Sequence, residues 1–198
     1  MTVRIIVPHR GLAAAKTRLS PVLDDAEREA LALRLLERVL GVVGGACSDV
    51  VVISPSQALQ AVVGRAGATL VVQRGMGLNA GLEQARDAAR ADGIEVLGVL
   101  HGDLPNLTDA DVASLLLPVA EQPGVVIAPD RAGTGTNGLA LSPIDAIGFR
   151  FGPGSFAAHR EEALRAGLPA SIVERPGLAF DLDTPADLAR WLELGDAA

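Results

Sequence analysis

Residues 96–105 read VLGVLHGDLP. The first five of them, from Val96 to Leu100, are apolar on both faces, which is typical of a central strand in a parallel sheet. The strand runs directly into His101 and Gly102, so we expect it to hold Asp103 at the carboxyl edge of the sheet. Ligands of open α/β sheets bind at that edge. The stretch therefore predicts an α/β fold with Asp103 at the rim of a binding site.

On both sides of this strand, short β-branched runs alternate with amphipathic stretches of helical length. This pattern favours a mostly parallel sheet with helices on both faces. We predict strands at 3–7, 50–53, 68–72, 96–100, 125–128, 139–141, 171–173 and 179–182. We predict helices near 25–43, after Pro55, at 78–91, after Thr108, from Phe156 and from Pro185. The chain shows no internal repeat or linker, so we expect one domain over residues 1–198.

The composition excludes several classes of protein. A net charge of -7 argues against binding to nucleic acid or to an anionic membrane, and 3% aromatic residues argue against base stacking. The single cysteine, Cys47, excludes an internal disulfide, and three scattered histidines do not suit a zinc cage. The sequence shows neither a signal-peptide pattern nor a run of about 18 apolar residues. We therefore expect a cytoplasmic protein with neither nucleic-acid nor membrane partners.

Lys16 is the only lysine among 17 basic residues. It lies in the loop after the first predicted strand, where small residues allow backbone N–H groups to approach an anion. Lys16 and Arg18 would add mobile positive charge. The loop matches neither a Walker A motif nor a GxGxxG fingerprint. It is either a phosphate site or an exposed loop with ordinary solubilising charge.

Residues 180–187 read FDLDTPAD and contain two acids, Asp181 and Asp183, that are not needed to cap the next helix. In an extended strand, Asp181 and Asp183 face the same side. Thr184 is the better helix cap, with Asp187 closing the capping box. Two carboxylates on one face repel each other unless a cation lies between them. Together with Asp103 they provide only oxygen ligands, which predicts a hard cation, Mg²⁺.

Two further glycine-rich segments carry hydroxyl groups, DRAGTGTN at 130–137 and FGPGSF at 151–156. Ser155 would lie at a helix N-terminus, where exposed amides can hold a phosphate or a carboxylate. Either segment could instead be a flexible turn. No Gly-x-Ser-x-Gly elbow is present, so a hydrolase triad is not expected. We expect His159 to be a helix-surface residue.

Five motifs, taken together and in order, resemble one family. They are AAKTRLS at 14–20, GDLP at 102–105, the DR and GTGTN of 130–137, the FG and SF of 151–156, and DLDTP at 181–185. The chain is similar to the guanylyltransferases of coenzyme F-420 biosynthesis, which act on phosphoenolpyruvate or 2-phospho-L-lactate. The resemblance implies a nucleotidyltransferase-like (Rossmann-like) sheet that is mostly parallel with one antiparallel strand, a role that residues 139–141 would suit.

The resemblance also implies what individual residues contact. The implied metal ligands, which would hold Mg²⁺, are Asp103, Asp181 and Asp183. The implied contacts to the phosphorylated acid are Thr136, Gly152 and Ser155. The implied nucleotide contacts are Lys16, Arg18 and Asn79, and the implied catalytic residues are Lys16 and Asp103. Gly154 departs from the family, whose members often carry a larger or polar residue there.

The implied reaction transfers GMP from GTP to the phosphate of a three-carbon acid and releases pyrophosphate. The acceptor phosphate is already ionised at neutral pH, so no general base is required. We favour phosphoenolpyruvate because the alanine- and arginine-rich composition indicates a high-GC bacterium. The expected partners are GTP and this acid, and a homodimer is left open. Two alternatives are a nucleotidyltransferase for 3-phosphoglycerate, molybdopterin or a sugar phosphate, and a non-catalytic α/β nucleotide-binding module.

Overall fold

The computed structural model describes residues 1–12, 15–193 and 195. Its strands are β1 (Val3–Pro8), β2 (Val50–Ser54), β3 (Thr69–Val72), β4 (Val96–Leu100), β5 (Gly124–Pro129), β6 (Thr136–Ser142) and β7 (Ala170–Ile172). Its α-helices are α1 (Asp25–Ala46), α2 (Gln60–Arg65), α3 (Leu78–Ala91), α4 (Asp109–Glu121), α5 (Ser155–Arg165), α6 (Pro176–Ala179) and α7 (Pro185–Glu193). Two short 3-10 helices are η1 (Thr17–Leu19) and η2 (Gln57–Leu59). Ala14, the first residue of the first motif, lies outside the described residues, as does Ala13.

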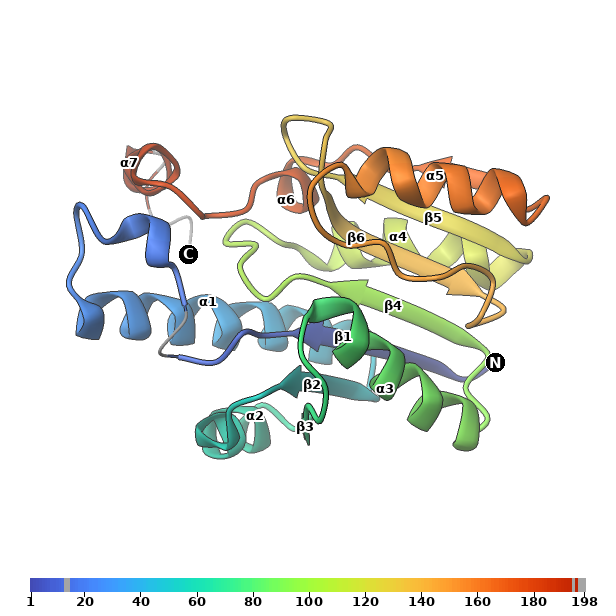
Figure 1. Ribbon diagram of the computed structural model, residues 1–198, viewed down its shortest axis with the longest axis horizontal. Helices are drawn as coiled ribbons and strands as arrows, with labels where there is room; N and C mark the ends of the chain where they lie inside the picture. The colour runs from blue at the N-terminus through green and yellow to red at the C-terminus, as the bar shows by residue number, and fades with distance from the viewer. Residues whose placement is uncertain (13–14, 194, 196–198) are drawn as a thin grey trace.

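The seven strands form one sheet in the order β3-β2-β1-β4-β6-β5-β7. Neighbouring strands are parallel except around β6, which is antiparallel to both β4 and β5. The predicted strand at 139–141 lies inside β6, so the expectation of one antiparallel strand is confirmed. The chain is a single α/β domain of the predicted class, and its parallel strands point their carboxyl ends toward the left of Figure 1.

Alternating apolar residues of the strands separate the core into two layers. Ile5 and Val7 of β1 pack with α1, α2 and α4, whereas Ile6 packs on the other face with α3 and α5. All three side chains are fully buried. This period of two follows from the pleat of a strand, and it explains why the central strands read as continuous apolar runs. Figure 1 shows the sheet between these two sets of helices.

A third apolar cluster lies beyond the carboxyl ends of the strands. It joins η1, the first half of α1, the segment before α7 and α7 itself, and these elements meet at the left end of Figure 1. Its members are Leu19, Leu31, Leu35, Phe180, Leu182 and Trp191. Leu19 follows Lys16 by three positions, and Leu182 lies between Asp181 and Asp183. The cluster therefore brings the Lys16 loop and the two acids to the same end of the sheet.

The predicted strand at 179–182 is wrong. Pro176 begins the helical turn α6 instead, as expected for proline at a first helical position. The backbone after it bonds to loops rather than to a neighbouring strand, with Leu182 donating to the carbonyl of Asp103 and Ala179 accepting from Arg131. The helix predicted from Phe156 begins one residue earlier, at Ser155.

No helix within the described part of the chain is long and apolar enough to cross a membrane.

Candidate active site

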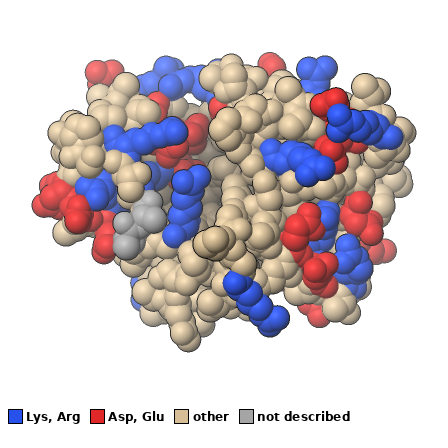
Figure 2. Space-filling model, in the orientation of Figure 1, with Lys and Arg blue, Asp and Glu red and all other residues tan. Residues whose placement is uncertain are grey.

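A cleft of about 870 Å³ opens at the carboxyl ends of β1, β2 and β4. Its volume falls in the range of small-molecule sites, which is roughly 300 to 1,000 Å³. Every predicted site residue except Asn79 lines it. Basic and acidic side chains meet at the hollow left of centre in Figure 2. The cleft therefore joins the Lys16 loop, the end of β4 and the glycine-rich loops in one site.

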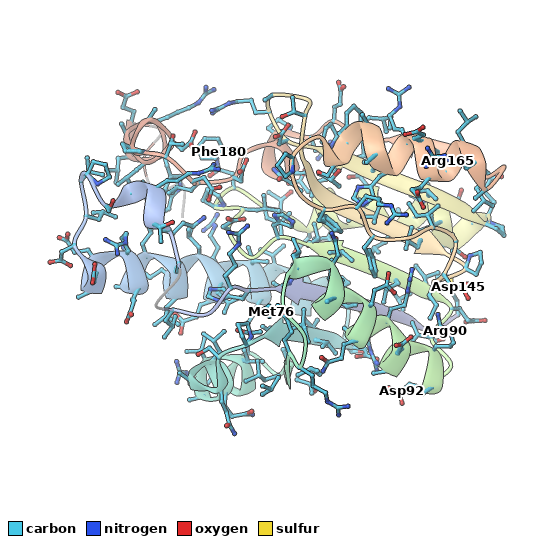
Figure 3. All side chains as sticks on the ribbon, viewed as in Figure 1. Met76, Arg90, Asp92, Asp145, Arg165 and Phe180 are labelled. Carbon is cyan, nitrogen blue, oxygen red and sulfur yellow. The ribbon has the colours of Figure 1, made fainter. Side chains whose placement is uncertain are left out.

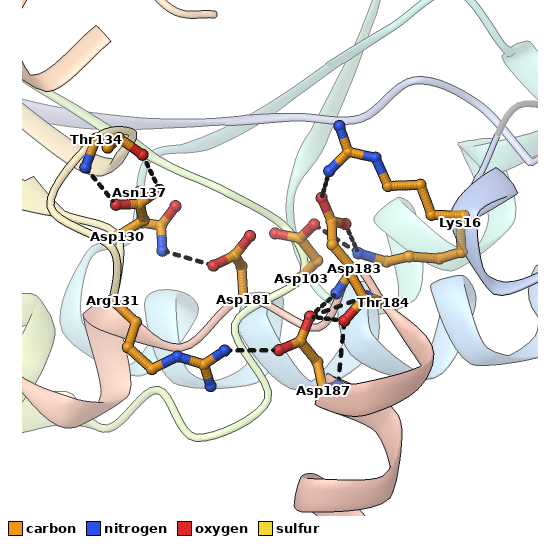
Figure 4. Close-up of polar contacts among 11 residues, drawn as sticks. Lys16, Asp103, Asp130, Arg131, Thr134, Asn137, Asp181, Asp183, Thr184 and Asp187 are labelled. Atoms are coloured by element: carbon orange, nitrogen blue, oxygen red, sulfur yellow. Dashed lines mark hydrogen bonds and ion pairs between the residues drawn. The ribbon is translucent and has the colours of Figure 1, made fainter. Parts of the chain in front are cut away.

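Lys16 lies between two of the predicted metal ligands. Its Nζ is 2.6 Å from Oδ2 of Asp103 and 2.9 Å from Oδ1 of Asp183 (Figure 4). The side chain is only 7% exposed. Lys16 has φ 52°, and it is the only non-glycine residue with positive φ in the described chain. Such a left-handed conformation costs energy and is retained where the surrounding structure imposes it. The loop thus aims one buried ammonium at two carboxylates.

The charges of this group support each other. Burial lowers the pKa of Lys16, but the charges of Asp103 and Asp183 outweigh it and the pKa lies above its ordinary value. Burial raises the pKa of Asp103, yet the interactions with Lys16, together with smaller contributions from His101 and His9, outweigh that, and this pKa lies below its ordinary value. Lys16 and Asp103 are therefore both charged at neutral pH.

Asp181, unlike Asp103 and Asp183, forms no ion pair with a residue that the structure describes. Burial and then the charge of Asp103 raise its pKa above the ordinary value. Its Oδ1 accepts one hydrogen bond, 3.3 Å long, from the side-chain amide of Asn137. Asn137, to which we assigned no role from sequence, also donates to the carbonyl of Leu178 and so holds this segment against β6.

The three carboxylates suit a hard cation. They line one cleft, offer only oxygen, and include one buried oxygen, Oδ1 of Asp103, without a hydrogen-bond partner among the described residues. They do not form a ready-made cluster. No group of three or more His, Cys, Asp or Glu side chains in the described chain is arranged to hold a metal, and an ammonium already lies between Asp103 and Asp183. Mg²⁺ at these residues stays a prediction.

The segment that carries Asp181 and Asp183 is fixed at its far end by the predicted capping box. Thr184 donates to Oδ2 of Asp187 through its amide and its hydroxyl, at 2.9 and 2.7 Å. The Arg131 guanidinium adds a 2.9 Å bond to Oδ1 of Asp187 (Figure 4). Contacts from the loop after β5 and from the start of α7 therefore fix the position of the segment that carries Asp181 and Asp183.

Thr136, Gly152 and Ser155 line the same cleft as Lys16 and the three aspartates. Thr136 and Ser155 are each 2% exposed. Gly152 has φ 133° and Gly154 has φ 74°, conformations that favour glycine. Asp130 shapes the adjacent loop by accepting from the amide of Thr134 at 2.8 Å. The positive φ angles thus give a physical reason for glycine at positions 152 and 154, which the sequence alone did not provide.

Asn79 and Arg18 are less directly placed. The Asn79 amide donates to the carbonyl of Phe151 at 3.0 Å, and its oxygen accepts from the Phe151 amide at 2.9 Å. Its side chain therefore connects α3 to the glycine-rich loop, while its neighbours Gly77 and Leu78 line the cleft. Arg18 lies at the rim, 74% exposed, and its guanidinium is 3.8 Å from Oδ2 of Asp183. The nucleotide roles of Asn79 and Arg18 stay predictions.

The expectation for His159 is wrong. Its side chain is fully buried, because the loop at 150–151 folds over the face of α5 that carries it. Sequence reasoning also missed His9 and His101, which line the cleft. Their positions could have indicated this, since His101 directly follows the predicted strand at 96–100 and His9 lies two residues after the one at 3–7.

The fold is that of the nucleotidyltransferases. The structure of a CMP:2-keto-3-deoxy-manno-octonic acid synthetase complexed with CTP matches with a TM-score of 0.65 at 15% identity, covering 98% of each chain. A 4-diphosphocytidyl-2C-methyl-D-erythritol synthase from Anaerococcus prevotii matches with a TM-score of 0.64 at 8% identity, covering 97% of this chain and 96% of its own. This likeness shows the fold alone. The family model shows more, because the chain belongs to the family described as "Guanylyl transferase CofC like", whose model matches residues 3–197.

Relatives of this chain bear names with three different acids. A phosphoenolpyruvate guanylyltransferase of Rubrobacter xylanophilus is 46% identical, over 96% of this chain and 93% of its own. A 2-phospho-L-lactate guanylyltransferase of Methanothermobacter thermautotrophicus is 36% identical, over 96% and 84%. A 3-phospho-D-glycerate guanylyltransferase of Phenylobacterium zucineum is 36% identical, over 92% and 86%. The resemblance seen in the motifs is confirmed, and family membership favours it over both alternatives.

Proposed function

We propose that the chain transfers GMP from GTP to the phosphate of phosphoenolpyruvate and releases pyrophosphate, as a step of coenzyme F-420 biosynthesis. One observation carries the proposal. The Lys16 ammonium is buried between Asp103 and Asp183, and Thr136 and Ser155 line the same cleft. Such a cleft combines positive charge and carboxylates for a triphosphate with hydroxyl donors for a small acid. The name of the relative at 46% identity supports phosphoenolpyruvate as the acid.

Asp103, Asp181 and Asp183 would hold Mg²⁺ in this proposal. The ion would supply positive charge that reduces repulsion between the two anionic substrates and stabilises the α-phosphoryl group. The unpartnered Oδ1 of Asp103 and the raised pKa of Asp181 both support a cation here, because each marks a carboxylate oxygen without compensating charge. Arg131 and Asn137 keep this segment in place.

The residues of the chain would act by position and charge. Lys16 contributes a compact ammonium to the triphosphate and keeps Asp103 ionised. Thr136 and Ser155 orient the acid, so that one of its phosphate oxygens faces the α-phosphorus in line with the leaving pyrophosphate. The acceptor oxygen is already an anion, so no residue has to remove a proton. A cleft rich in aspartate and without a paired histidine base is consistent with this chemistry.

A panel assay of pyrophosphate release tests the function. Each of GTP, ATP, CTP and UTP is paired with phosphoenolpyruvate, 2-phospholactate and 3-phosphoglycerate in the presence of Mg²⁺. We expect GTP with phosphoenolpyruvate to give the highest kcat/KM. Preferred use of another acid would overturn the acceptor assignment alone. Absence of release from GTP with all three acids would overturn the proposed function.

Gly152→Ala is expected to raise the KM for phosphoenolpyruvate at least about tenfold, while the KM for GTP changes less than about twofold. The space around a new Cβ is open, but φ 133° strains any L-residue, so the loop has to shift. Gly167→Ala is the matched control, because it also has positive φ in open space and lies outside the cleft. Equal effects of the two substitutions on the acid's KM would contradict the placement.

A further inference from the structure

His159 joins two segments of the acid-binding side from a fully buried position. Its Nε2 accepts the backbone N–H of Arg150 at 3.0 Å, and its Nδ1 is 3.0 Å from Oγ1 of Thr136. The ring of Phe151 packs against it edge to face at 4.8 Å. One imidazole therefore contacts both the start of β6 and the loop that leads to Gly152.

These contacts define which nitrogen carries the proton. A backbone N–H can only donate, so Nε2 must be the unprotonated nitrogen that accepts it. A neutral imidazole then carries its proton on Nδ1. Burial lowers the pKa of His159 to about 4, which keeps the ring neutral at physiological pH. Nδ1–H is therefore the donor to Thr136.

The Nδ1–H of His159 determines which hydrogen bonds the Thr136 hydroxyl can make. Because its hydroxyl oxygen accepts from His159, its own proton is free to donate elsewhere. No acceptor for that proton is recorded among the described residues, and Thr136 lines the cleft. The proton is thus available to an anionic oxygen of a bound acid.

We propose that His159 is a positioning residue for the acceptor acid, acting through Thr136, whose hydroxyl it fixes as a donor into the cleft. This inference rests on the proposed function, since it takes the ligand of Thr136 to be a small phosphorylated acid. It gives His159 a role in substrate selection without any proton transfer in the reaction.

Two conservative variants separate the two hydrogen bonds of the ring. The amide of asparagine reproduces the position of Nδ1, so His159→Asn can still donate to Thr136. The amide of glutamine reproduces the position of Nε2, so His159→Gln can still accept from Arg150 but loses the bond to Thr136. A purely structural role would make these two variants similar in kinetics.

The experiment measures the KM for phosphoenolpyruvate and for GTP, and the Kd for phosphoenolpyruvate by calorimetry in the presence of Mg²⁺. Each His159 variant is made twice, once with Thr136 in place and once with Thr136→Val. We expect His159→Gln to raise the KM and Kd for phosphoenolpyruvate about tenfold and His159→Asn to raise them less than about threefold, with the KM for GTP unchanged. In a Thr136→Val background, both substitutions should have no further effect, because coupled residues are not additive. Equal effects of Asn and Gln, or additive effects in Thr136→Val, would overturn the inference.

Nitrogen NMR of isotope-labelled histidine provides a readout that needs no substrate and no variant. The chain has three histidines, and His9 accepts from the amide of Gly11 through Nδ1. We therefore expect opposite tautomers, Nδ1–H for His159 and Nε2–H for His9. An Nε2–H or cationic His159 at about pH 6.5 would overturn the inference even in an active enzyme. The expected tautomer with no phosphoenolpyruvate turnover would instead count against the proposed function.

Discussion

We expect Asp103→Asn to lower kcat by at least about 100-fold, or about 2.7 kcal/mol of transition-state stabilisation, at saturating substrates. The carboxylate pairs with Lys16 through Oδ2, and its buried Oδ1 has no partner among the described residues. An asparagine keeps the shape but removes the charge that would hold a cation. Turnover measured over a series of Mg²⁺ concentrations, with binding of Mn²⁺ followed by electron paramagnetic resonance, checks both consequences.

Asp145→Asn is the matched control for this substitution. Asp145 is 55% exposed and lies at the opposite end of the molecule from Phe180, which marks the cleft end (Figure 3). It should keep normal turnover and normal Mn²⁺ binding. A folded Asp103→Asn protein with kcat within about threefold of the parent, at any Mg²⁺ concentration, would contradict the metal assignment.

We expect Lys16→Arg to lower kcat at least about thirtyfold, or about 2 kcal/mol, even though the positive charge is kept. The ammonium is buried at 2.6 and 2.9 Å from two carboxylates. A planar guanidinium is larger and cannot occupy that position without moving Asp103 or Asp183. Lysine and arginine have a similar energetic cost for the backbone conformation at φ 52°, so a difference in kcat between them reports on the charged end of the side chain.

Arg165→Lys is the control for an exchange of the two basic side chains, since Arg165 is 63% exposed and lies outside the cleft. Steady-state kinetics should show a change of less than about threefold for this variant. If Lys16→Arg behaves like Arg165→Lys, the proposed contact of Lys16 with the triphosphate is refuted.

The acids at 181 and 183 show what alternation in a sequence can predict. The pattern correctly places Asp181 and Asp183 on one side, since both line the cleft while Phe180 and Leu182 lie in the third apolar cluster. It wrongly predicts a strand. An alternating pattern indicates which side of an extended segment is buried, but not what covers that side. Here Phe180 and Leu182 pack into the third apolar cluster, and no strand of the described chain pairs with the segment.

His159 and Asn79 show what the sequence could not reveal. Each bonds to a backbone group of Arg150 or Phe151, in a loop that no periodic pattern describes. Helical spacing places His159 on α5 but gives no information about a loop folding over it. The α/β class with its mostly parallel sheet could be predicted, by contrast, because short apolar strands alternate with amphipathic stretches of helical length along the sequence.

Identification of the product tests the central claim most directly. The claim is that an oxygen of the acceptor phosphate attacks the α-phosphorus of GTP in this cleft. Incubation with GTP, Mg²⁺ and phosphoenolpyruvate labelled with heavy oxygen in its phosphate, followed by mass spectrometry and phosphorus NMR, should give two coupled phosphorus signals of a diphosphate diester. All of the label should be in that diester, with one pyrophosphate released per diester. Formation of GDP, or label in pyrophosphate or free phosphate, would contradict the account.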